Sequence, residues 1–156
     1  MRRVVVTGLG AVTPLAVGMR TTWKRILTGE SGITSVLTER PPASQWKGIP
    51  STVAGLVPLD KGKGAEHEWR PSEWLSAVEQ DKMPRHTQYA VAVSEMALKD
   101  ADWAATTEKE KAMSGISMGS GIGDLDHLYT TSLGYNQDVS HGSSRAYELT
   151  GANIYK

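Results

Sequence analysis

Residues 3–14, Arg-Val-Val-Val-Thr-Gly-Leu-Gly-Ala-Val-Thr-Pro, decide the fold class at the start of the chain. The β-branched run over residues 3–7 predicts a buried strand, and Gly8-Leu9-Gly10 predicts a tight turn directly after it. Pro14 prevents a helix from running through this region, because it lacks a backbone N–H and its ring clashes with the preceding turn. The chain is therefore expected to open with a strand and a turn.

Strands and helices alternate beyond this opening. We expect two further strands, over residues 51–57 and 112–118, and polar loops over residues 59–70 and 104–111. The predicted helices are a short one capped by Thr21, one over residues 74–80 capped by Ser72, a long buried one over residues 85–101, and one that follows Asp124. The order strand, helix, strand, helix, strand, helix predicts an α/β fold.

Composition excludes several classes of function. Lys+Arg and Asp+Glu are both 17, so the net charge of zero gives no electrostatic footprint for nucleic acid or an anionic membrane. The sequence has no cysteine, which excludes disulfides and cysteine-ligated metals, and its four histidines form no paired ligand motif. No apolar run has the length of a bilayer span, and we expect no targeting leader because the first residues enter the strand directly.

The first glycine turn raises the possibility of a dinucleotide site, because such a turn can seat a pyrophosphate on a helix N-terminus. The pattern breaks at Thr13, where the third glycine is missing, and Pro14 blocks the helix that would follow. A nucleotide-binding α/β domain is therefore kept only as a minor hypothesis.

A second glycine-rich turn, Gly-Ser-Gly-Ile-Gly, spans residues 119–123. It lacks the Lys-Ser/Thr of a phosphate-binding loop, so it indicates either a plain turn or a close backbone approach to a ligand. Asp124 and Asp126 follow it at a helix start, where acidic residues usually cap the helix and match its dipole. By itself this turn is weak evidence for function.

Several segments taken together resemble the β-ketoacyl-[acyl-carrier-protein] synthase family. They are the opening over residues 2–15, the Thr-Trp-Lys to Gly-Glu-Ser-Gly-Ile stretch over residues 22–33, the segment over residues 80–90, and the turn over residues 119–123. The resemblance covers residues 2–133 and points to the discrete, type-II-like enzymes. Residues 69–79 look most like the mitochondrial branch of fungi.

The resemblance implies the N-terminal half of a thiolase-like layered α-β-α-β-α fold, incomplete in this chain. It also implies an acyltransferase reaction, in which malonyl-carrier protein is condensed with an acyl chain in fatty acid biosynthesis and carbon dioxide is lost. A cysteine takes up the acyl group in that family, while two histidines and backbone amides stabilise the intermediates. No catalytic residue is carried over, because this chain has no cysteine and its histidines lie in other segments.

Substrate binding is the one role that the resemblance carries over. It places Ile122 at the acyl pocket as a gate, with Gly121 and Gly123 allowing close backbone approach. It implies no metal and no cofactor, since the substrate is carried on the phosphopantetheine arm of acyl carrier protein. The implied partners are acyl carrier protein and a second copy in a homodimer, with no nucleic acid or membrane. The implied location is mitochondrial, with a cytoplasmic location as the alternative.

The last part of the chain does not follow the family pattern. We expect a β-ketoacyl synthase region over residues 1–133 and a divergent polar tail or insertion over residues 134–156, with foreign sequence over residues 136–154. Three explanations stay open: a fragment of a longer enzyme, a truncated or mis-spliced product, or a genuine short protein. In the last case we expect a non-catalytic form that binds a full-length synthase or acyl carrier protein.

Overall fold

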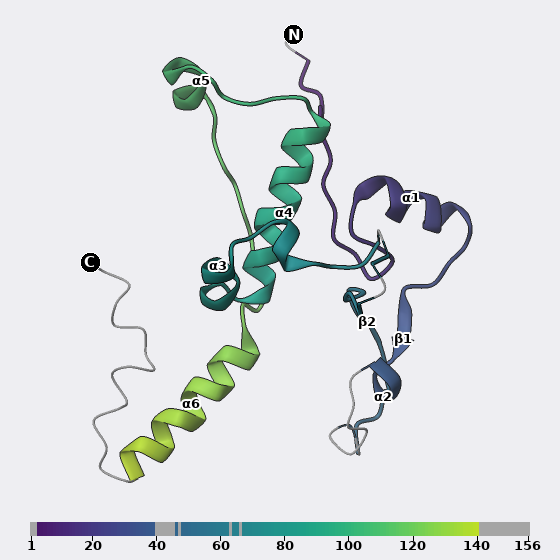
Figure 1. The fold of residues 1–156 in the computed structure, drawn as a ribbon, viewed down its shortest axis with the longest axis vertical. Coiled ribbons are helices and arrows are strands. Elements are labelled where there is room, and N and C mark those ends of the chain that lie inside the picture. The colour runs from purple at the N-terminus through teal and green to yellow at the C-terminus, as the bar shows by residue number, and fades with distance from the viewer. Residues whose placement is uncertain (1–2, 40–45, 47, 63, 66, 141–156) are drawn as a thin grey trace. The chain divides into compact units, whose positions relative to one another are not determined.

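The structure is a computed structural model, and it describes residues 3–39, 46, 48–62, 64, 65 and 67–140 (Figure 1). The chain forms two compact units, one of Met1–Met83 with Thr87–Gly115 and the other of Pro84–His86 with Ile116–Lys156. The helices and strands are α1 (Met19–Leu27), β1 (Ile33–Ser35), α2 (Val36–Glu39), β2 (Val53–Gly55), the 3-10 helix η2 (Pro71–Glu73), α3 (Ala77–Lys82), α4 (Arg85–Asp100), α5 (Glu108–Met113) and α6 (Leu125–Ser140).

The core of the first unit is built around Val17, Trp69 and Ala92, with Tyr89 among the residues packed against them. Trp69 is 3% exposed, and its ring meets that of Tyr89 edge to face, with 4.7 Å between the centroids. The backbone N–H of Trp69 donates to the Pro58 carbonyl at 2.6 Å, which holds the main chain of residue 69 against residue 58. The prediction of a solvated loop over residues 59–70 is therefore wrong for Trp69, because the loop returns to the core to bury this side chain.

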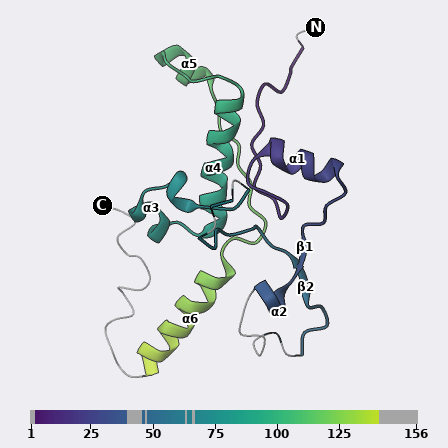
Figure 2. The same ribbon diagram turned by 45° about the vertical axis from the view of Figure 1, so that its right-hand side comes forward.

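Helix α4 confirms the helix predicted over residues 85–101 and ends one residue earlier, but the prediction that it is buried is wrong for most of it, because only Gln88 and Ala92 are buried. Its Ala92 is fully buried, and the extended N-terminal segment lies beside the helix in both views (Figure 1, Figure 2). A Cβ atom added to Gly8 would lie 2.1 Å from the Ala97 carbonyl oxygen, and one added to Gly10 would lie 2.0 Å from that of Val93. The two glycines are therefore required for this close backbone contact rather than for an unusual turn.

Two of the predicted strands are wrong. Residues 3–7 are extended but pair with no strand among the described residues, and Val4, Val5 and Val6 are 72–97% exposed. Residues 112 and 113 end α5, and residues 114–118 have no regular structure. A β-branched run favours extended backbone, but a strand also needs a neighbour to accept and donate its ladder hydrogen bonds, and the described residues supply none here.

The sheet of the described residues consists of β1 and β2, paired antiparallel with Thr34 opposite Ala54. β2 confirms the centre of the strand predicted over residues 51–57, whereas β1 was not predicted. Gly55 lies against Pro14, whose Cγ would be 3.1 Å from an added Cβ. This contact joins the short sheet to the turn that follows the N-terminal segment.

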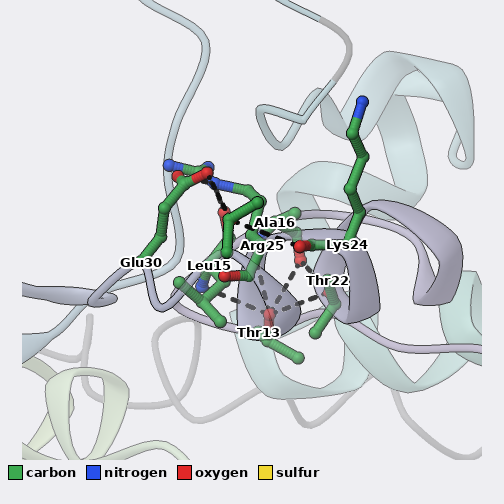
Figure 3. Close-up of polar contacts among 8 residues, drawn as sticks. Thr13, Leu15, Ala16, Thr22, Lys24, Arg25 and Glu30 are labelled. Atoms are coloured by element: carbon green, nitrogen blue, oxygen red, sulfur yellow. Dashed lines mark hydrogen bonds and ion pairs between the residues drawn. The ribbon is translucent and has the colours of Figure 1, made fainter.

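A polar network fixes α1 to that turn (Figure 3). The Thr13 hydroxyl accepts hydrogen bonds from the backbone N–H groups of Leu15 and Ala16, and it lies 3.1 Å from the hydroxyl of buried Thr22. Arg25 donates to the Leu15 carbonyl and forms a 2.6 Å ion pair with Glu30. The predicted helix is thus present, although it begins after Gly18 (φ 97°) rather than at Thr21.

Capping boxes decide where two short helices begin. The Ser76 side chain accepts from the Glu79 N–H and the Glu79 carboxylate accepts from the Ser76 N–H, so α3 begins at residue 77 rather than at the predicted residue 74. Thr107 and Glu110 make the same reciprocal pair at the start of α5. The prediction of a loop over residues 104–111 is therefore wrong from residue 108 onward.

Helix α6, in the second unit, confirms the helix predicted after Asp124, whose carbonyl accepts from the Leu128 N–H at 3.1 Å. It continues through Gly134 to Ser140, into the stretch over residues 134–156 that is expected to be a divergent polar tail or insertion. The rest of the predicted tail, residues 141–156, lies outside the described residues. No helix of the described part of the chain has both the length and the apolarity to cross a bilayer.

Candidate substrate-binding turn

The glycine turn over residues 119–123 is open on the side where a Cβ would point. No atom lies within 4 Å of a Cβ built on Gly119, Gly121 or Gly123, so within this structure the backbone approaches nothing closely. Gly123 has φ 79°, a conformation that side-chain-bearing residues rarely adopt. The turn therefore requires glycine at position 123 for its own geometry, and it holds the Ile122 side chain 79% exposed.

Ile122 lines a shallow pocket in the second unit, with a volume of about 240 Å³. The other lining residues are Arg85, His86, Gly123, Asp124 and Leu125. Ile122 and Leu125 supply branched apolar side chains, whereas Arg85 and Asp124 supply opposite charges. This mixture can hold an apolar chain that carries a polar group at one end.

The structure brings together two of the three predicted site residues. Ile122 and Gly123 line the pocket, whereas Gly121 does not. The sequence reasoning missed Arg85 and His86, which lie at the start of α4, well before residues 119–123 in the sequence. The sequence pattern did not identify them, because no local pattern indicates that the start of a helix contacts a turn far away in the sequence.

Shifted pKa values lie away from this pocket, and each has a structural cause. The Ser76 hydrogen bonds lower the pKa of Glu79 within the capping box of α3. The Arg25 hydrogen bond lowers the pKa of Glu30. The pKa of Asp60 is lowered, chiefly by the Gly62 N–H, and that of Arg70 is raised, chiefly by the Glu73 carboxylate, within a surface ion-pair group among the described residues. The same part of the chain holds no group of three or more metal-ligating side chains.

The glycine turn, the opening segment and the long helix together match a known domain. The family model described as "Beta-ketoacyl synthase, N-terminal domain" matches residues 1–155, so the chain belongs to the β-ketoacyl synthase family. The family match runs across the domain boundary predicted at residue 133, which stays a prediction.

Individual relatives agree with this membership. A protein of Schizosaccharomyces pombe that bears the name of a mitochondrial 3-oxoacyl-[acyl-carrier-protein] synthase is 40% identical over 126 residues, 81% of this chain and 28% of that protein. The "3-oxoacyl-[acyl-carrier-protein] synthase, mitochondrial" of Arabidopsis thaliana is 38% identical over 133 residues, 80% of this chain and 28% of its own length. The chain thus spans less than a third of these relatives.

A solved structure supports the fold prediction. The ishigamide ketosynthase/chain length factor is similar with a TM-score of 0.62 at 26% identity, over 93% of this chain and 32% of that one. The prediction of part of a thiolase-like α/β fold is thereby confirmed, even though the described residues pair only two short strands.

Proposed function

We propose that these residues are the N-terminal part of a 3-oxoacyl-[acyl-carrier-protein] synthase that elongates acyl chains in fatty acid biosynthesis. The observation that carries the proposal is the family match over residues 1–155 together with an exposed, pocket-lining Ile122 on the matching turn. The reaction is a decarboxylative condensation of malonyl-carrier protein with an acyl chain. Its nucleophile is a cysteine, and the 156 residues contain none, so we expect no condensing activity from them alone.

Ile122 has the properties that an acyl gate needs. Its branched apolar side chain is held on a backbone whose geometry is fixed by Gly123, so it can close or open a tube without a polar group entering it. Leu125 adds a second branched apolar side chain to the lining of the pocket. Within the proposal, the size of residue 122 limits the length of acyl chain that is accepted.

The proposal includes partners and a location. Acyl carrier protein presents the substrate on its phosphopantetheine arm, no dissociable cofactor or metal takes part, and the complete enzyme is a homodimer. We place it in mitochondria, supported by the mitochondrial names of the fission yeast and Arabidopsis relatives. A cytoplasmic location is the alternative, as relatives such as "3-oxoacyl-[acyl-carrier-protein] synthase 2" of Rhizobium meliloti are bacterial.

The proposed gate is tested in the complete polypeptide with Ile122→Trp. We expect kcat/KM for long acyl chains to fall about 10-fold or more while short-chain condensation persists, because a clash of a few kcal/mol affects only chains that reach the gate. Ile116→Trp is the matched control, since it introduces the same side chain in the same unit at a residue that does not line the pocket. An unchanged chain-length preference for Ile122→Trp would refute the gate.

The non-catalytic alternative is tested by the intact mass of the native polypeptide, captured with an antibody to this region. A mass well above 16.9 kDa supports the synthase, and a mass near 16.9 kDa supports a short form that binds a full-length synthase or acyl carrier protein.

A further inference from the structure

Gln88 is a buried polar side chain that has no role in the acyl site described above. It lies one turn into α4, is 9% exposed, and does not line the pocket of Ile122. A buried amide is normally hydrogen-bonded within the protein, because water cannot reach it to satisfy its donors. The partners of its amide therefore indicate which part of the fold this side chain holds in place.

The side-chain amide of Gln88 holds the end of α3. Its Nε2 donates to the carbonyl oxygens of Gln80 and Met83, each at 2.9 Å. Gln80 lies in the last turn of α3, and Met83 follows that helix as its C-cap. The last carbonyls of a helix find no partner within it, so the two donors of one NH2 group supply what this helix end lacks.

The chain between α3 and α4 is short, which gives these hydrogen bonds a defined geometry. Pro84 separates the two helices and has no N–H of its own. It also restricts the residue before it to extended backbone, and Met83 has ψ 129°. Helix α4 begins directly afterwards, at Arg85. The hydrogen bonds from Gln88 therefore close a tight corner from the side of α4.

The same turn of α4 carries two residues of the candidate site. Arg85 and His86 precede Gln88 on the helix and line the pocket with Ile122. The backbone hydrogen bonds of a helix hold the residues of one turn in a fixed arrangement, so a contact that fixes Gln88 also fixes the first residues of α4. Site residues need such support, since a displacement of about 1 Å can remove much of their effect.

We propose that Gln88 is a positioning residue for the candidate acyl site. Its two hydrogen bonds to the end of α3 hold the first turn of α4, so that Arg85 and His86 complete the lining of the Ile122 pocket. Gln88 thereby affects which acyl chains are accepted without touching them. The inference rests on the proposed function, because only a condensing enzyme has a chain-length preference to measure.

The test measures chain-length preference in the complete polypeptide with Gln88→Met, which keeps an unbranched side chain of similar size but removes the N–H donors. The readout is the ratio of kcat/KM for a myristoyl chain to that for a hexanoyl chain, both presented on acyl carrier protein. We expect this ratio to fall about 5-fold or more, because a displaced lining affects only chains that reach it. Gln88→Asn, whose amide is one methylene shorter, should lower the ratio too, and it replaces Gln88→Met if that variant does not fold.

Gln80→Met is the matched control, with Tm recorded for every variant. The Gln80 side chain also donates to a carbonyl, that of Leu75 at 2.9 Å, but this hydrogen bond does not involve α4. The same substitution there should lower Tm and leave the ratio unchanged. The positioning role is overturned if a folded Gln88 variant keeps the wild-type ratio, if Gln80→Met shifts the ratio equally, or if neither Gln88 variant folds.

Ile122→Trp distinguishes a failure of this inference from a failure of the proposed function. A ratio that responds to Ile122→Trp but not to Gln88→Met overturns the positioning role and leaves the proposed function standing. Absence of condensation by the wild-type polypeptide overturns both.

Discussion

Replacing Gly8 with alanine should separate the N-terminal segment from α4. The added Cβ would lie 2.1 Å from the Ala97 carbonyl oxygen and 2.7 Å from the Ala101 nitrogen. Because backbone atoms cannot rotate away, the segment has to move by about 1 Å even to reach 3.0 Å, and the Leu9–Asp100 hydrogen bond at 3.0 Å is strained in the process. Overpacking of this kind costs about 1–3 kcal/mol, and we expect the upper end of that range because the clash is with backbone.

Thermal unfolding followed by circular dichroism measures the effect. A loss of 2–3 kcal/mol in a unit of this size lowers Tm by about 10 °C. Gly115→Ala is the control, since it lies in the same unit with open space around it and an ordinary φ; it should be neutral or stabilise by about 0.4–1 kcal/mol. Equal melting temperatures for Gly8→Ala and Gly115→Ala would refute the proposed packing of the segment on α4.

Two further predictions concern the core and the caps. Trp69→Ala should cost about 3–5 kcal/mol in urea denaturation, because it removes the 3%-exposed indole and its contact with Tyr89. Trp23→Ala, at a side chain that is 53% exposed, should change stability by only about 0.5 kcal/mol, and equal losses would contradict the assigned core. The Thr107 backbone hydrogen bond is the largest cause that lowers the pKa of Glu110 from 4.5 to about 2. Because the pKa of Glu110 is lower in the folded chain than in the unfolded chain, its ionised carboxylate stabilises the folded chain above pH 4.5. This stabilisation is lost as the pH falls from 4.5 toward 2, so α5 should unwind in that pH range. Amide chemical shifts followed by NMR should show this in the native chain and not in Glu110→Gln; an identical acid profile in both would contradict it.

Sequence patterns predicted the elements whose signals are local. The helical spacing of residues 85–101 gave α4 almost to the residue, and the start of α6 followed from Asp124. The capping boxes at Ser76 and Thr107 can also be recognised in the sequence, as Ser-x-x-Glu and Thr-x-x-Glu. They would have predicted the first residue of both short helices correctly. Local chemistry of this kind needs no knowledge of the rest of the fold.

Features that depend on distant partners were not predictable. The run over residues 3–7 has the composition of a buried strand, but its burial depends on neighbours that no local pattern contains. Trp69 looked like part of a polar loop because the residues before it are polar, yet its own size decides its burial. At the candidate site, the turn and Ile122 could be named from the motif, whereas Arg85 and His86 join them only through the folded chain.

The hydrogen bond between Leu9 and Asp100 spans 91 residues, and this separation sets an order of events during synthesis. The N-terminal segment is made first, but the helix surface on which Gly8 and Gly10 pack does not exist until α4 has been translated. At about 5–20 residues per second, the segment waits roughly 5–20 s before the helix that Gly8 and Gly10 pack against has been made. This segment is thus made well before the surface on which it packs, and a chaperone has that interval in which to bind it.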